Sequence, residues 1–281
     1  MIYIGLTGWG DHETLYTADT KPQEKLQDYS SHFPVVELDA SFYAIQPKRN
    51  IEKWIKETPE KFQFVVKAYQ GMTGHQRGES PFESKQAMFE AFKESIIPFQ
   101  KTGKLATVLF QFPPWFDCKK EHVQYIRYCK RQMGDIQVAL EFRHQSWYSD
   151  SFREQTIAFM KDEGWMHSVA DEPQAGKGSV PFVPITTHPD TTIIRLHGRN
   201  FHGWTRSGNE NWREVRYLYD YNKEELLTVA NEVTQLNQSN HDVIVLFNNN
   251  SGGHAANNAK QLQEILGIDY QGLAPKQLDL F

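Results

Sequence analysis

Short runs rich in β-branched and aromatic residues recur along the chain, each followed by a turn signal. The segments between most of them place apolar residues three or four apart, as in Met88, Phe92, Ile96 and Phe99. Strands and helices are therefore predicted to alternate. The eight predicted strands cover residues 2–7, 35–39, 63–68, 106–111, 136–142, 165–169, 192–198 and 243–248.

Eight such alternations predict a single α/β domain of the (β/α)₈ TIM-barrel type over residues 1–270, because parallel strands need crossover helices and eight strands close a sheet. An open doubly wound sheet is the alternative, but no GxGxxG follows the first strand. The helix after the sixth strand is expected to be missing or irregular, since residues 171–190 carry Pro and Gly without a helical period. Residues 71–81 and 199–222 are expected to form long loops at the C-terminal face.

The composition is that of a globular protein: 281 residues, 39% hydrophobic and 23% charged, with a net charge of −5. These values exclude disordered and disulfide-rich classes. No apolar run reaches the roughly eighteen residues that cross a bilayer, and the first residues do not resemble a signal peptide. We therefore expect a soluble cytoplasmic protein without a membrane partner. Cys118 and Cys129 fit reduced thiols better than a bridge or a zinc site.

Polar residues gather at the C-terminal ends of the predicted strands, where barrels of this type keep their active sites. Residues two apart on a strand face the same side, which pairs Glu37 with Asp39, Glu141 with Arg143, and Arg195 with His197. The candidates for catalysis are Glu37, Glu141, Asp171 and His197. The candidates for substrate binding are Asp39, Lys67, Gln111, Arg143, His144, Trp147, Arg195, Arg199, Asn248 and Asn249.

The charge balance of this set bears on its chemistry. Four carboxylates face three cations, which favours an anionic organic substrate over a divalent metal; a metal stays possible, and any cofactor is unknown. Glu141 or Asp39 would exchange a proton while the cations hold phosphate or carboxylate oxygens. The alternative is a buried salt-bridge network that closes the barrel mouth. The Arg- and aromatic-rich loop 199–221 has the composition of single-stranded nucleic-acid sites, although such aromatics commonly pack a loop onto its own barrel.

The strand-end motifs together resemble a known family. They are GLTGW from Gly5, ELDASFY from Glu37, FQFPP from Phe110, EFRH from Glu141 with Trp147, DEP from Asp171, RLHGR from Arg195 and FNN from Phe247. In this order they resemble the Domain of Unknown Function 72, or YecE-like, family. The resemblance implies a (β/α)₈ barrel with the motifs at one end, and no particular reaction. Asp39 stands where the resemblance often expects Asn, which favours Glu37 and Glu141 for proton transfer.

The tail, residues 271–281, ends in Gln277, Leu278, Asp279, Leu280 and Phe281. This pentapeptide is similar to the peptide that binds the bacterial DNA polymerase sliding clamp, with the apolar residues entering a groove. The alternative is that the tail docks on its own barrel. Clamp binding predicts an enzyme acting on a phosphate-bearing substrate, including nucleic acid. A non-catalytic clamp-associated adaptor and a metabolic enzyme for a small phosphorylated or carboxylated molecule are the other hypotheses.

Overall fold

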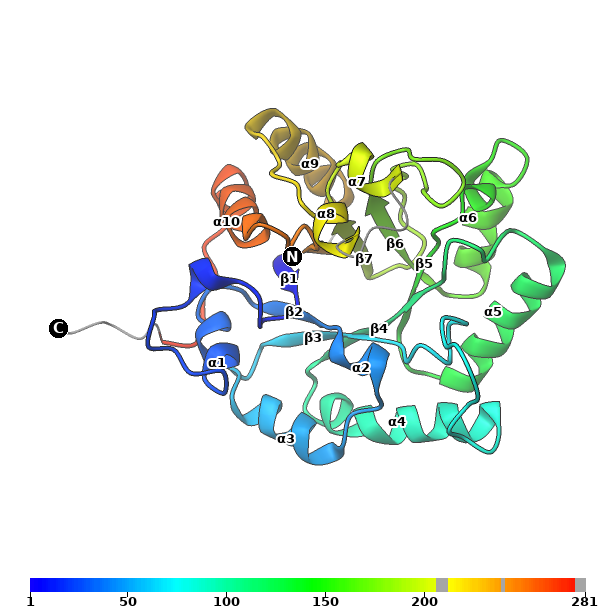
Figure 1. Ribbon diagram of the computed structural model, residues 1–281, viewed down its shortest axis with the longest axis horizontal. Helices are drawn as coiled ribbons and strands as arrows, with labels where there is room; N and C mark the ends of the chain where they lie inside the picture. The colour runs from blue at the N-terminus through cyan, green and yellow to red at the C-terminus, as the bar shows by residue number, and fades with distance from the viewer. Residues whose placement is uncertain (206–211, 239–240, 276–281) are drawn as a thin grey trace.

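The structure, a computed structural model, describes residues 1–205, 212–238 and 241–275. Eight parallel strands pair in sequence order, and pairing of β8 with β1 closes the sheet into a barrel. Helices lie around the outside of the barrel (Figure 1). This confirms the predicted (β/α)₈ barrel. The strands are β1 (Ile2–Thr7), β2 (Val35–Leu38), β3 (Gln63–Lys67), β4 (Leu105–Gln111), β5 (Val138–Glu141), β6 (Met166–Asp171), β7 (Thr191–Leu196) and β8 (Asp242–Phe247).

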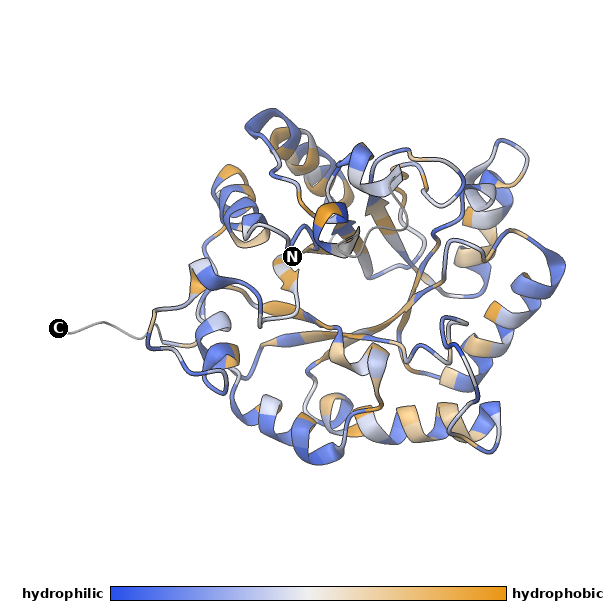
Figure 2. Ribbon diagram, viewed as in Figure 1, coloured by the Kyte–Doolittle hydropathy of each residue, from blue (hydrophilic) through white to orange (hydrophobic). Residues whose placement is uncertain are grey.

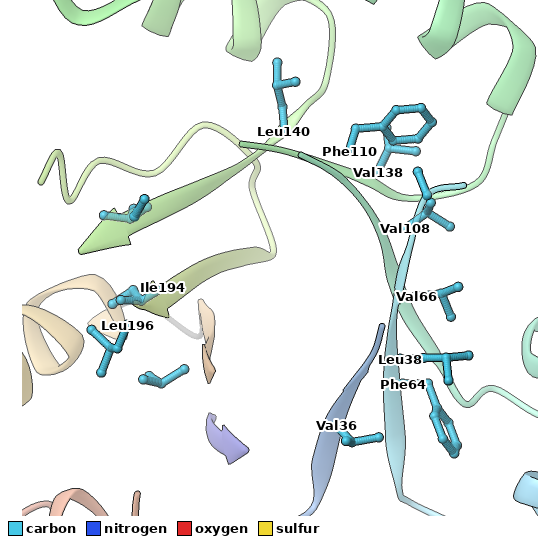
Figure 3. Close-up of a cluster of buried hydrophobic side chains, with 14 of the residues drawn as sticks. Val36, Leu38, Phe64, Val66, Val108, Phe110, Val138, Leu140, Ile194 and Leu196 are labelled. Atoms are coloured by element: carbon cyan, nitrogen blue, oxygen red, sulfur yellow. The ribbon is translucent and has the colours of Figure 1, made fainter. Parts of the chain in front are cut away.

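The strands bury both of their faces, as parallel barrel strands do. One alternate set of side chains points outward and packs beneath the helices, including Val36, Leu38, Phe64, Val66, Phe110 and Leu140 (Figure 3). The other set forms a separate core that fills the lumen: Val35, Val65, Leu109, Ala139, Met166, Ile193, Ile244 and Leu246. Since residues two apart share a face, the lumen set fixes which later residues of each strand point into the barrel mouth.

Helices surround the barrel, and their apolar faces turn toward the strands while their outer faces are hydrophilic (Figure 2). In α4, the residues that predicted a helix, Met88, Phe92, Ile96 and Phe99, are all buried, and Ser84 accepts a capping hydrogen bond from the Ala87 amide. The helices are α1 (Lys25–Tyr29), α2 (Ala40–Tyr43), α3 (Lys48–Lys56), α4 (Lys85–Lys101), α5 (Lys120–Met133), α6 (Arg153–Asp162), α7 (Phe201–Thr205), α8 (Trp212–Arg216), α9 (Lys223–Leu236) and α10 (His254–Ile265), with 3₁₀ turns η1 (Glu13–Leu15) and η2 (Gln145–Tyr148).

Two of the long connections can be compared with expectation. Residues 172–190, between β6 and β7, contain no helix, as predicted. The connection after β7 was expected to be a long loop, and its described part carries two short helices, α7 and α8. The Asn200 side chain joins these helices: it accepts from the Gly203 amide and donates to the carbonyls of Val215 and Leu218. Hydrogen bonds made by a single side chain produce no periodic pattern in the sequence, so these two short helices could not be predicted from periodicity.

The C-terminal segment returns to the N-terminal end of the barrel. The Tyr270 hydroxyl accepts from the Ile4 amide at 2.8 Å and donates to the Ile2 carbonyl at 3.2 Å. Backbone contact continues past residue 270, because the Ala274 amide donates to the Ser30 carbonyl, just before β2. The chain therefore reaches exposed Pro275 at the end opposite the mouth. The pentapeptide at 277–281 lies outside the described residues. Within the described ranges, no helix is long and apolar enough to cross a membrane.

Candidate active site

The period-two pattern of the lumen places a polar layer directly above the apolar one. Val35 is followed by Glu37, Val65 by Lys67, and Ala139 by Glu141, each two residues further along its strand. The same step from the other lumen residues leads to Gln111, Ser168, Arg195 and Asn248, and Thr7 lies at the matching level of β1. Most of the residues chosen from strand ends are therefore brought together at one end of the lumen.

Arg195 is the centre of this layer. Its Nε and Nη2 donate to the two carboxylate oxygens of Glu37 at 2.8 and 2.7 Å, and its Nη1 donates to both oxygens of Glu141 at 3.0 and 2.8 Å. All three side chains are at most 1% exposed. Burial works against the charge of Arg195, but the two carboxylates outweigh it and raise its pKa. Such a fully paired guanidinium is a structural crossbar rather than an open binding group.

Glu141 is satisfied on every side. Besides Arg195, it accepts hydrogen bonds from Gln111 at 2.6 Å, from Ser168 at 3.0 Å and from Arg143 at 3.3 Å. Burial alone would raise its pKa, yet Arg195 and its other neighbours hold the pKa well below the usual range. Glu141 is thus ionised across the working pH range, which makes it an acceptor and not a proton donor.

His197 sits beside these groups and is completely buried. Burial, together with Arg143 and Arg195, lowers its pKa well below the usual value, so the ring is neutral. Nε2 lies 3.1 Å from Arg143 Nη1 and 3.3 Å from Glu141 Oε1. Nδ1 lies 2.8 Å from the side-chain nitrogen of Asn248. Both ring nitrogens are occupied, which gives His197 the character of a positioning group.

Lys67 and Asp39 form the outer edge of the site. Lys67 Nζ lies 3.0 Å from Asp39 Oδ1 and 4.6 Å from the centre of the Phe42 ring. Their side chains are 13% and 32% exposed, so this pair reaches solvent where the Arg195 network does not. Burial lowers the pKa of Lys67, but Asp39 and Glu37 outweigh it, and the pKa is raised overall. Lys67 is therefore a permanent cation at the rim.

The sixth strand contributes a carboxylate that sequence reasoning missed. Ser168 points into the lumen, so two further steps lead through Ala170 to Glu172, while Asp171 faces the other way. Glu172 Oε2 lies 2.7 Å from Arg143 Nη2, and Oε1 accepts from the Val180 amide at 2.6 Å. Burial raises the pKa of Glu172 to about 7, against the opposing effect of Arg143. Strand periodicity would have found Glu172 if the strand had been extended beyond Val169.

Asp171 takes part in a second network, outside the lumen. It accepts hydrogen bonds from Arg199 Nε and Nη2 at 2.9 to 3.1 Å and from the Tyr221 hydroxyl at 2.6 Å. Arg199 also reaches Glu225 at 3.2 Å, which connects the end of β7 to α9. The expectation that Asp171 shares the position of the other strand-end acids is therefore wrong, because one residue along a strand reverses the face.

Three further candidates lie in packing or capping positions. Trp147 is 1% exposed, stacks on Phe142 at 3.9 Å and donates from its indole nitrogen to the Phe116 carbonyl. Asn249 is fully buried and donates to the Tyr219 carbonyl and to Asn258. His144 caps η2 by accepting from the Ser146 amide. These contacts give Trp147 a packing role and His144 a capping role, and they hold the side-chain nitrogen of Asn249, whereas the buried Asn249 Oδ1 has no hydrogen-bond partner.

The connection after β7 covers part of the mouth with aromatic side chains. The Trp204 ring lies 4.9 Å from the guanidinium carbon of Arg143 and 3.6 Å from that of Arg216. Tyr217 lies 6.4 Å from the His197 ring. Packing of this loop onto its own barrel was one of the two interpretations of its composition, and these contacts support that one for the residues the structure describes.

The sequence did not decide whether the site binds a metal ion. Among the described residues, no three His, Cys, Asp or Glu side chains group in a way that could hold a metal ion. The carboxylates of the mouth are each paired with a cation: Glu37 and Glu141 with Arg195, Asp39 with Lys67, and Glu172 with Arg143. The donor set fits an anionic ligand better than a cation.

Comparison with known proteins agrees with this fold. Residues 3–279 match the family described as "Protein of unknown function DUF72". The UPF0759 protein YunF of Bacillus subtilis is 66% identical, with both chains fully covered, and UPF0759 protein YecE of Escherichia coli K12 is 23% identical over 56% of this chain and 54% of its own.

Solved structures of DUF72 family proteins also superpose on this chain. A DUF72 family protein of Enterococcus faecalis superposes with a TM-score of 0.93 at 39% identity, covering 99% of this chain and 100% of its own. A DUF72 family protein of Thermotoga maritima gives 0.81 at 32% identity, covering 95% and 100%. With the strand-end motifs gathered at one end of the barrel, as the resemblance implied, this chain belongs to the DUF72 family.

Proposed function

We propose that the mouth of this barrel is an active site for a phosphate-bearing substrate, which Lys67 and Arg143 bind. The observation that carries this proposal is the contrast between the cations of the mouth. Arg195 donates four hydrogen bonds to two buried carboxylates. Lys67 instead pairs with the single carboxylate of Asp39 at the rim, and Arg143 pairs with Glu172, whose pKa is about 7. Of these three cations, Lys67 and Arg143 are the ones available to exchange partners with an incoming anion.

Glu172 is the proton-transfer group in this proposal. General acid–base catalysis is most effective when the pKa of the catalytic group lies near the working pH. Burial raises the pKa of Glu172 to about 7. The sequence predicts Glu37 and Glu141 as the catalytic acids. In this proposal they instead lie beneath the substrate and do not transfer protons, because Arg195 keeps both of them paired.

Exposed aromatic side chains around the mouth favour a substrate that carries rings, such as a nucleotide or nucleic acid. Tyr43, Trp115 and Phe201 are each at least half exposed, and they follow β2, β4 and β7 on the connections that leave the mouth. Base stacking on aromatic rings beside cations is the usual way single-stranded nucleic acid is bound.

We also propose that residues 277–281 tether the barrel to the bacterial sliding clamp, which would place the protein in the cytoplasm near DNA. Support comes from the agreement of all five positions with the clamp-binding peptide. Pro275, the last described residue, is exposed and follows a segment bonded to the N-terminal end of the barrel. A tether leaving from that end would keep the mouth open to a substrate.

The test is binding by the full chain of three probes: inorganic phosphate, a deoxynucleoside monophosphate and a labelled single-stranded oligonucleotide. Lys67→Met should weaken binding of each by about tenfold or more, since a charge-assisted contact is lost. Lys61→Met is the matched control, because Lys61 is exposed just before β3, at the opposite end from Lys67. Equal affinities of the two variants and the wild type would overturn the proposal.

The same titrations separate the other hypotheses. Binding of the oligonucleotide without conversion, across divalent metals, would favour the non-catalytic adaptor. Binding of small phosphorylated or carboxylated molecules, but not of the nucleotide or oligonucleotide, would favour the metabolic enzyme.

A further inference from the structure

Arg143 and Glu172 form an ion pair that differs from the others in the mouth. Nη2 and Oε2 are 2.7 Å apart, but Oε2 is buried and accepts no hydrogen bond, in contrast to the carboxylate oxygens that Arg195 holds. Oε1 is fixed by the Val180 amide at 2.6 Å. One oxygen of Glu172 is thus anchored, and the other is near a cation without a directed bond.

We infer that a phosphate group replaces the Glu172 carboxylate on Arg143, one of the two anion-binding residues of the mouth, while Glu172 takes up a proton from solvent. This inference rests on the proposed function, because it assigns a mechanism of binding to the same site. In the exchange, the O–H of protonated Glu172 becomes a donor to a phosphate oxygen, and Oε1 keeps its bond to the Val180 amide.

The surroundings of Arg143 favour this exchange. Its Nη1 is held by Glu141 at 3.3 Å and by His197 at 3.1 Å, so the guanidinium stays in place when Glu172 changes its charge. The Trp204 ring lies 4.9 Å from Arg143 and 3.6 Å from Arg216, which brings two like charges to one ring. Burial and then Arg143 lower the pKa of Arg216, which reflects this crowding of positive charge.

The groups that face Glu172 define its proton affinity. Arg143 and Glu141 come from the end of β5, Arg216 from α8, Tyr148 from η2, and the Val180 amide from the connection after β6. Burial, then Glu141 and Glu172, raise the pKa of Tyr148 far above neutral, so it stays protonated. Glu172 is consequently the group of this set that titrates near neutral pH.

Sulfate is the probe for the test, since its charge does not change between about pH 5 and 9. Calorimetric titration of the full chain at pH 8, in HEPES and in Tris, should show uptake of one proton per sulfate. Sulfate affinity should fall about tenfold per pH unit above 7. In Glu172→Gln, affinity should become independent of pH and proton uptake should vanish. Glu163→Gln, which alters a carboxylate paired with Arg127 on the outer surface, should match the wild type.

A second measurement keeps the inference testable if the Gln variant fails to fold. Carboxyl-¹³C glutamate NMR of the wild type should show one resonance that titrates near pH 7 and remains protonated above pH 8 with saturating sulfate. Sulfate binding without proton uptake would overturn the inference and leave the proposed function standing. Failure of sulfate, phosphate and nucleotide to bind at pH 6 would overturn both.

Discussion

Arg195 and Glu141 are joined by two hydrogen bonds of 3.0 and 2.8 Å across the fully buried top layer of the barrel lumen. The same guanidinium makes two further bonds to Glu37 from the opposite side of the lumen. One side chain of β7 therefore ties together β2 and β5, which are not neighbours in the sheet. This crossbar separates an apolar core below from a polar, partly exposed mouth above.

Removing the crossbar should be costly. In Arg195→Met, Glu37 and Glu141 stay buried without their cation, and the free energy of unfolding should fall by about 3–5 kcal/mol. Urea denaturation measures this. The triple variant with Glu37→Gln and Glu141→Gln should recover a large part of the loss, because it removes the unpaired charges. A loss below about 1 kcal/mol in the single variant would show that the network is not structural.

The outer network should depend on one hydroxyl. The Tyr221 hydroxyl accepts from the Gly198 amide at 2.9 Å and donates to Asp171 at 2.6 Å, in a buried position. Tyr221→Phe leaves the amide without its partner and should lower unfolding free energy by about 1–3 kcal/mol. Tyr219→Phe, which loses a bond to Glu225 at a less buried site, is the control and should cost less. Equal losses would argue against a special role for Tyr221.

Stability should depend on pH through Glu172. Its pKa is raised to about 7 from an ordinary value of 4.5, so the folded state binds this proton more tightly than the unfolded state. The stabilisation is fully present below pH 4.5 and is lost as pH rises through 7. The wild type should lose about 3 kcal/mol of unfolding free energy between pH 4.5 and 8 that Glu172→Gln does not lose. Parallel stability profiles of the two proteins would contradict the assignment.

The backbone of β1 leaves no space for a side chain at Gly5. A Cβ built there would lie 2.1 Å from the Val35 carbonyl oxygen, on the paired strand β2. Gly5→Ala should therefore force the first two strands apart and cost about 3 kcal/mol or more, measured by thermal and urea unfolding. Gly10→Ala is the control, since nothing lies within 4 Å of its Cβ position. A soluble Gly5→Ala variant of wild-type stability would show that the strands can adjust.

Deleting residues 277–281 should abolish binding to a bacterial sliding clamp in a pull-down or calorimetric titration. The described chain before this peptide is bonded to Ser30, at the barrel end away from Lys67 and Arg143. Binding of sulfate and nucleotide at the mouth should accordingly be unchanged by the deletion. Clamp binding that persists without the peptide would remove the argument for a tether.

The sequence determined the barrel itself, because the alternation of strand and helix periods and the polar residues at the strand ends are local patterns that can be read directly from the sequence. It also determined that Glu37, Lys67, Glu141 and Arg195 would meet, since period-two spacing and strand order together specify one end of the lumen. The family motifs carried the same information.

Only the tertiary structure decided which charges are satisfied and which are available. Arg195 pairs with Glu141 and Glu37, which lie 54 and 158 residues away in the sequence. This pairing depends on distances across the lumen. The course of β6 decided that Glu172 points into the barrel mouth and Asp171 points away from it, because neighbouring residues along a strand face opposite sides. The pKa of Glu172 follows from burial, which no local pattern encodes.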